Sequence, residues 1–147
     1  MSRSLNEIAA ELRALTPADF DLHNVEANGD ERLAALCAEL AEQDDPQQWA
    51  PLLYSLMERL DEADLGSPGP IVHTLEARSG YHSALAESLR RKPAPLTVWM
   101  ANRVLNLDPP DAAAWLGLLH QAAKHPAASA QAQSDAHHFL EYQATRR

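Results

Sequence analysis

Apolar residues recur at helical spacing along this chain, in short segments that proline and glycine separate. In the first segment, Leu5, Ile8, Leu12 and Leu15 fall on one face of a helix over residues 5–15. No segment alternates polar and apolar residues for long enough to indicate a strand. Because proline inside a helix removes a hydrogen bond, the recurring prolines keep the helices short. The spacing therefore predicts an all-α fold.

The same periodicity predicts a series of helices joined by loops. Residues 16–29 are rich in turn-forming residues and are expected to form a loop. The helices expected after residues 5–15 cover residues 30–40, 48–63, 68–79, 81–91, 96–107, 109–125 and 127–143. All of them are short enough to pack as antiparallel pairs.

Individual residues are expected to start and anchor these helices. Pro51 is expected in a first turn, where a missing N–H costs nothing, so that regular helix begins near Gln48. Phe139, Leu140 and Tyr142 are expected to anchor the last helix. The residues predicted to cap helix N-termini are Ser4, Asp30, Ser67 and Asp108.

A dense cluster of turn-forming residues stands between two of the predicted helices. Gly66 and Gly69 allow the backbone to turn sharply, and Pro68 and Pro70 stiffen the entry to the next helix. We therefore expect one helix to stop here and the next to start at once.

A weak internal repeat points to a stacked arrangement. The pattern W-x-x-L-L-x-x-L beginning at Trp49 recurs 66 residues later as W-x-x-L-L-x-x-A at Trp115, and a looser version begins halfway between, at His82. Repeated helix pairs of about this length stack to bury a continuous core. We expect short antiparallel helix pairs stacked as a small HEAT-like α-solenoid, in a single helical domain over residues 1–147.

Charge is distributed unevenly along the chain and restricts its partners. The net charge is −9; residues 1–66 carry 4 Lys and Arg against 15 Asp and Glu, and residues 67–147 carry 8 against 6. Nucleic acid or an anionic membrane would be repelled by the acidic half. A basic protein is the partner that this charge favours, although acidity that only keeps the protein soluble is the alternative.

Cysteine content and hydropathy point to the cytoplasm. Cys37 is the single cysteine, so no intramolecular disulfide is possible, and it falls on an apolar stripe where an inert buried thiol is expected. No apolar run approaches the roughly 18 residues that span a bilayer. The first residues are amphipathic and lack a hydrophobic signal core. A cytoplasmic protein is expected.

Motifs for catalysis are missing from the sequence. Residues 61–64 spell D-E-A-D, but no phosphate-binding G-x-x-x-x-G-K-[ST] loop accompanies them. The histidines form no H-E-x-x-H motif, and no G-x-S-x-G nucleophile motif occurs. We therefore expect no enzyme, no cofactor, no metal and no small-molecule substrate.

Seven residues remain as a candidate partner-binding surface. Acidic residues stand at both ends of the helix expected at residues 48–63. On a neighbouring helix, a tryptophan and an asparagine are three residues apart, so the two side chains can lie on one helix face. Aromatic anchors beside charged groups are typical of binding hot spots, although core packing is the alternative role for the tryptophan. The candidates are Asp44, Asp45, Asp61, Glu62, Asp64, Trp99 and Asn102.

The motifs L-G-S-P-G-P-x-V-H (residues 65–73) and W-M-x-N-R-x-L-N (residues 99–106) carry a family resemblance. Over roughly residues 45–140 the chain resembles small helical immunity proteins encoded beside bacterial polymorphic toxins, which include Rhs-type and contact-dependent effectors. The resemblance implies a non-catalytic inhibitor that binds one cognate toxin C-terminal domain in the producing cell's cytoplasm. It transfers no contact residues, because the toxin-facing surface varies with the toxin.

Two other functions stay open from the sequence. A helical adaptor or scaffold could bind a host protein or peptide in a groove without catalysis. A small enzyme could use His73 or His82 with a nearby carboxylate. The immunity hypothesis predicts a basic toxin domain as partner, whereas the adaptor hypothesis does not.

Overall fold

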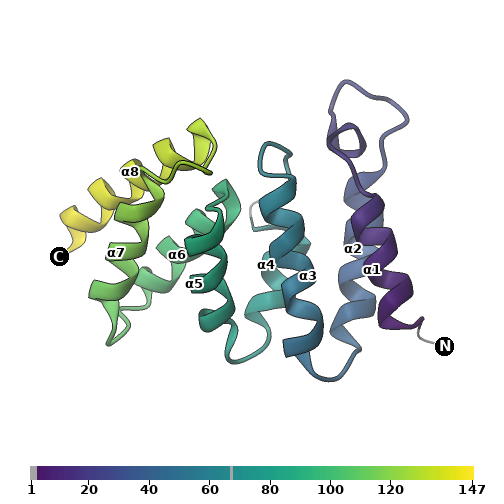
Figure 1. Ribbon diagram of the computed structural model, residues 1–147, viewed down its shortest axis with the longest axis horizontal. Helices are drawn as coiled ribbons and strands as arrows, with labels where there is room; N and C mark the ends of the chain where they lie inside the picture. Colours follow the sequence, from purple (N-terminus) through teal and green to yellow (C-terminus); the bar gives the residue numbers. More distant parts are fainter. Residues whose placement is uncertain (1–2, 67) are drawn as a thin grey trace. The chain divides into compact units, whose positions relative to one another are not determined.

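The computed structural model describes residues 3–66 and 68–147, and this part of the chain contains helices and no strands (Figure 1). This confirms the all-α prediction. The helices are α1 (Leu5–Ala14), α2 (Gly29–Ala41), α3 (Pro46–Arg59), α4 (Gly69–Glu76), α5 (Tyr81–Arg91), α6 (Pro95–Asn106), α7 (Ala112–Ala122) and α8 (Ala130–Arg146), with a short 3-10 helix, η1 (Pro17–Phe20), between α1 and α2.

The helices form two compact units, which divide between Tyr81 and His82. Unit 1 contains α1 to α4; in it α1 packs against α2 and α3, and α2 packs against α4 (Figure 1). Because each helix turns one apolar stripe inward, these pairings enclose a core of leucine and isoleucine. Its buried residues include Ile8, Leu12, Leu33, Leu36, Leu40, Leu53, Met57, Ile71 and Leu75.

Unit 2 contains the rest of α5 together with α6, α7 and α8. Helix α6 packs against both α7 and α8, and α7 packs against α8. Its buried residues include Leu85, Leu89, Val98, Met100, Val104, Leu105, Trp115 and Leu119. The division into two units does not test whether residues 1–147 fold as a single domain, which stays a prediction.

The helix starts agree with the predicted caps in one case and differ in two. Ser4 accepts a hydrogen bond from the Glu7 backbone N–H at 3.2 Å, which confirms it as the cap of α1. Asp30 is not a cap, because α2 begins one residue before it, at Gly29. Asp108 is not a cap either: it adopts a φ of +51°, and the turn formed by the two following prolines delays α7 until Ala112.

The prediction for Pro51 is also wrong. Helix α3 begins at Pro46, so Pro51 is the sixth helical residue and lies beyond the first turn. Pro46 takes the favoured position at the start of the helix, where its missing N–H is harmless. The helix continues through Pro51 because packing of the surrounding buried residues, Trp49, Leu53 and Tyr54, compensates for one lost backbone bond.

The glycine and proline cluster forms the sharp stop and start that its residues predict. Gly66 and Gly69 have φ angles of +94° and +74°, in the region that favours glycine. A Cβ on Gly66 would lie 2.7 Å from the Gly69 Cα, so the two glycines also permit a close backbone approach. The predicted cap Ser67 lies outside the described residues, and Pro68 directly precedes α4.

The buried face of helix α8 includes small and polar residues that the prediction did not name. Phe139 and Leu140 are half-buried on this face, whereas Tyr142 is 46% exposed, so the prediction is wrong for Tyr142. The small side chains of Ala132 and Ala136 are fully buried on the same face, where they let α8 approach its neighbours closely. Gln143 completes the buried face and is fully enclosed.

Candidate functional site

The five acidic candidates lie at the two ends of α3. Asp44 and Asp45, here called the acidic pair, precede the helix, and both are exposed. Asp61, Glu62 and Asp64, here called the acidic triad, follow it. At about 1.5 Å per residue, a helix of 14 residues places these two clusters about 20 Å apart. They form two separate acidic clusters in unit 1 and not one compact patch.

Local backbone geometry presents both clusters to solvent. Asp45 adopts a φ of +53°, which non-glycine residues rarely do, and its side chain makes no capping bond to α3. In the triad, Asp64 Oδ1 accepts a hydrogen bond from the Gly66 backbone N–H at 3.1 Å, which helps to shape the turn. Glu62 and Asp64 are exposed and Asp61 is half-buried.

Trp99 and Asn102 lie on α6, in unit 2, and have different surroundings. The Trp99 ring is half-buried, and the Arg103 guanidinium carbon lies 5.0 Å from its centroid, within the range of a cation–π contact. Asn102 is only 8% exposed, and its Oδ1 accepts a hydrogen bond from Gln143 Nε2 at 2.7 Å. Asn102 is therefore a packing residue between α6 and α8, while Trp99 keeps part of its ring at the surface.

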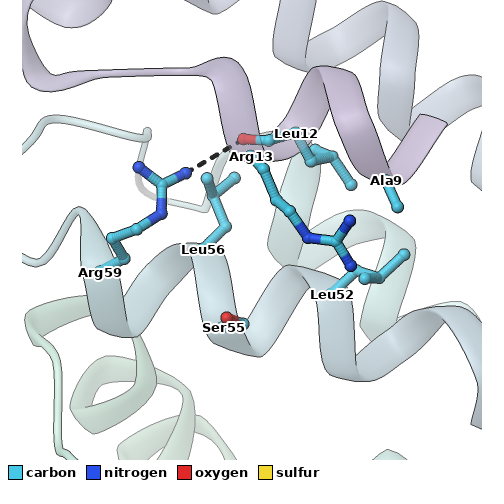
Figure 2. A pocket seen from close by; sticks show the side chains of 7 residues that line it. All are labelled: Ala9, Leu12, Arg13, Leu52, Ser55, Leu56 and Arg59. Atoms are coloured by element: carbon cyan, nitrogen blue, oxygen red, sulfur yellow. Dashed lines mark hydrogen bonds between the residues drawn. The ribbon is translucent and has the colours of Figure 1, made fainter. Parts of the chain in front are cut away.

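A surface hollow between α1 and α3 was not predicted from the sequence. It has a volume of about 90 Å³ and is lined mainly by Leu12 and Arg13 from α1 and by Leu52, Ser55, Leu56 and Arg59 from α3 (Figure 2). The signal in the sequence was the pair Arg13 and Arg59, which are two of only four basic residues before residue 67. Hydrophobic periodicity could not reveal the hollow, because the hollow depends on which helices pack together.

The two arginines of the hollow have different roles. Arg59 donates hydrogen bonds to the Leu15 and Leu12 carbonyl oxygens, at 2.8 and 3.1 Å, and so holds the C-terminal end of α1 against α3. Arg13 is exposed and has no hydrogen-bond or ion-pair partner in the described part of the chain. Figure 2 shows the two side chains on either side of Leu56.

Metal-ligand clusters and the single cysteine were the remaining candidates for chemistry. No group of three or more His, Cys, Asp or Glu among residues 3–66 and 68–147 could hold a metal ion. Cys37 is 2% exposed, and burial raises the pKa of its thiol to about 11, so it stays protonated and unreactive at neutral pH. Within the same ranges, no helix is both long and apolar enough to cross a membrane.

Comparison with known proteins identifies no relative. No family model, no curated protein and no solved structure matches this chain. The likeness to toxin immunity proteins therefore depends on the two sequence motifs quoted above.

Proposed function

We propose that this chain is an immunity protein that binds a cognate bacterial toxin domain and neutralises it by occluding the active site or the access of substrate. The charge of residues 1–66, net −11, is the observation that carries this proposal. Toxins that act on nucleic acids or nucleotides must attract phosphate and are therefore basic. The protein would act without catalysis in the cytoplasm of the cell that produces the toxin.

The acidic pair and the acidic triad are the proposed contact residues. Both clusters are at the surface, and the approximately 20 Å between them is about the width over which a standard interface of ~800 Å² per partner extends. Charges at this separation accelerate the encounter with a basic partner more than they add to final affinity. Trp99 is a separate candidate anchor in unit 2, and Asn102 is left out because it is buried.

A HEAT-like stack is the architecture we propose for this function. In unit 1, α1 packs on α3 and α2 on α4, as expected when two helix pairs stack in two layers. The repeated tryptophans also correspond: Trp49 and Trp115 are each the fourth residue of their helix, and both are buried. Each buried indole N–H lacks a hydrogen-bond partner in the described part of the chain. A stiff stack of this kind would hold the acidic clusters at a fixed separation.

A helical adaptor is the second candidate function. The hollow between α1 and α3 favours it, because the half-buried Leu52 and the exposed Arg13 together can accept a peptide side chain. An adaptor would not need a toxin gene beside its own.

Co-expression tests the immunity function directly. The C-terminal domain encoded by the reading frame upstream of this gene is expressed in a bacterial host with and without this protein. We expect growth arrest by the domain alone and restored growth when both are present. Arrest that this protein does not relieve, or an upstream frame that encodes no secreted protein, would contradict the proposal.

Neutralising variants test the acidic clusters. We expect Asp61→Asn/Glu62→Gln/Asp64→Asn to associate with the toxin domain roughly tenfold more slowly at low salt. The amide oxygen introduced at position 64 would still accept the Gly66 N–H, so the turn should persist. Asp44→Asn/Asp45→Asn should also slow association, since asparagine tolerates the positive φ at position 45. Stopped-flow fluorescence measures the rates.

A matched control separates the clusters from net charge alone. Glu87, Asp111 and Glu141 are exposed acidic residues of unit 2, and Glu87→Gln/Asp111→Asn/Glu141→Gln removes the same number of charges as the triad variant. We expect this control to associate at nearly the unmodified rate. An equal slowing would show that overall charge is responsible and would remove the acidic clusters from the proposed interface.

A further inference from the structure

The hollow between α1 and α3 combines an unpaired cation with an apolar floor, and the acidic clusters do not account for it. From this combination we infer that the hollow is a docking site for a partner peptide segment in which a carboxylate side chain stands next to an aliphatic one. The carboxylate would pair with Arg13, and the aliphatic side chain would pack on Leu52 and Leu56. This inference does not rest on the proposed toxin partner.

Arg13 is the positive charge with which a carboxylate of the peptide would pair. The other three arginines before residue 60 are engaged: Arg3 with Glu11 and Glu39, Arg32 with Asp19 at 3.4 Å, and Arg59 with backbone carbonyls. Arg13 has no such partner among the described residues, although 15 acidic residues occur in the same part of the sequence. An exposed arginine beside a hollow can form two parallel hydrogen bonds to an incoming carboxylate.

The floor of the hollow suits one aliphatic side chain. Leu52 is half-buried and presents apolar surface at the base, with the almost fully buried Leu12 and Leu56 beneath it. A volume of about 90 Å³ equals the share of roughly three water molecules in the liquid, which is room for a single small side chain. Ser55 is exposed at the rim and adds a hydroxyl group that can bond to a peptide backbone.

The charge around the hollow selects a peptide over a polyanion. Residues 1–66 carry a net charge of −11, which would repel nucleic acid or an anionic membrane surface. A peptide with one carboxylate experiences far less repulsion and can still pair with Arg13. The occupant that fits is therefore a short acidic and apolar peptide segment.

Nuclear magnetic resonance of the full, isotope-labelled chain tests this site with defined probes. The probes are acetyl-Gly-Leu-Glu-Leu-Gly-amide and its neutral match, acetyl-Gly-Leu-Gln-Leu-Gly-amide. We expect millimolar binding of the acidic peptide, about two- to fivefold tighter than the neutral one, as one exposed ion pair provides. Resonance changes should concentrate at the Arg13 side-chain N–H and at the Leu52 and Ser55 amides.

Two variants assign the effect to Arg13. Arg13→Gln should bind both peptides with equal, weaker affinity, and its fold should be intact because Arg13 has no partner to lose among the described residues. Arg90→Gln is the matched control: Arg90 is an exposed arginine in the last turn of α5, as Arg13 is in the last turn of α1. We expect Arg90→Gln to keep the preference for the acidic peptide.

Four results would overturn the inference. These are equal affinity for the two peptides, changes spread evenly over the chain, equally large changes with sodium acetate alone, and changes that depend on protein concentration without peptide. Acetate alone would indicate an adventitious ion only, and concentration dependence would indicate a second copy of this chain as the occupant.

Discussion

At the residue scale, Gly66 has the strictest requirement in the cluster of turns before α4. Its φ of +94° favours glycine, and the Gly69 Cα lies 2.7 Å from where a Cβ would stand. Two independent constraints, one on the backbone angle and one on space, therefore act on the same position. Gly80 has a similar φ of +86° but open space around it, so only the first constraint applies there.

This contrast gives a prediction with a built-in control. We expect Gly66→Ala to lower the free energy of unfolding by about 2–4 kcal/mol, because strain from the positive φ adds to a backbone clash. Gly80→Ala should cost only about 1 kcal/mol, from the backbone angle alone. Urea denaturation followed by circular dichroism measures both. Equal losses in the two variants would show that the close approach to Gly69 has no energetic weight.

At the element scale, cationic or histidine side chains bind the C-terminal carbonyl groups of other helices. Carbonyls at a helix C-terminus lack the regular i+4 backbone donor, and the helix dipole makes them negative. Leu12 O and Leu105 O also accept a backbone N–H of the turn that follows their helix. Side-chain bonds of this kind join helices that are distant in the sequence. The bonded pairs are Arg59 with Leu12 and Leu15 O, Arg78 with Ala41 O, His125 with Arg90 O, and Arg146 and Arg147 with Leu105 O.

A buried amide network fixes the pairing of α6 with α8. Gln143 Nε2 donates hydrogen bonds to Asn102 Oδ1 at 2.7 Å and to Asn106 Oδ1 at 2.9 Å. Arg146 Nη1 donates to Gln143 Oε1 at 3.0 Å, so both ends of the Gln143 amide are satisfied. Because these bonds form in only one register, the network specifies how the two helices align.

Removing the centre of this network should be costly. We expect Gln143→Met, which keeps the side-chain length, to lower the free energy of unfolding by about 1–3 kcal/mol, since it leaves the buried Asn102 oxygen without a donor. Gln131→Met, at an exposed position of the same helix, should change it by less than about 0.5 kcal/mol. Thermal or urea unfolding measures the difference, and a loss of similar size in both variants would argue against the network.

At the scale of the whole molecule, most charges are acidic, and a few of them are tied to arginine. Arg3 makes ion pairs with Glu11 on α1 and Glu39 on α2, thereby joining the two helices. Hydrogen bonds from Arg3 hold the pKa of both carboxyl groups below the ordinary glutamate range. Asp19 has a lowered pKa as well, mainly because it accepts the Thr16 backbone N–H.

The lowered pKa values determine the direction of the pH dependence. A carboxylate whose pKa is lower in the folded state stabilises the fold above the ordinary glutamate pKa, about 4.3, and this contribution is lost as pH falls through the lowered value. We expect Glu11→Gln/Glu39→Gln to be less stable than the unmodified protein at pH 7 and to lose less stability between pH 5 and pH 3. Thermal unfolding across this range measures the effect.

Acidification also reduces the repulsion among the many negative charges, which by itself stabilises the fold. Replacing any two acidic residues with neutral ones changes this repulsion by a similar amount. The control is therefore Glu26→Gln/Glu42→Gln, at two exposed glutamates of the same half that have no arginine partner within the described residues. This control should keep the acid sensitivity of the unmodified protein. If the two double variants lost stability in parallel as the pH fell, the ion pairs of Arg3 would be excluded as the source of the acid sensitivity.

Sequence by itself determined the helical class, most helix ranges, the cap at Ser4 and the sharp turn at Gly66. These features depend on local spacing and on backbone angles, which neighbouring residues largely decide. Regular helix over residues 81–91 and its predicted boundaries are confirmed, because an apolar stripe and strong end signals coincide there. The uneven charge was also evident from the sequence, since counting needs no coordinates.

Only tertiary structure decided which helices pack together and which side chains meet. It enclosed Asn102 against Gln143 and left Tyr142 46% exposed. It also brought Arg13 and Arg59 to one hollow from positions 46 residues apart. Burial depends on the neighbouring helix, and a periodic pattern along one helix does not identify that neighbour.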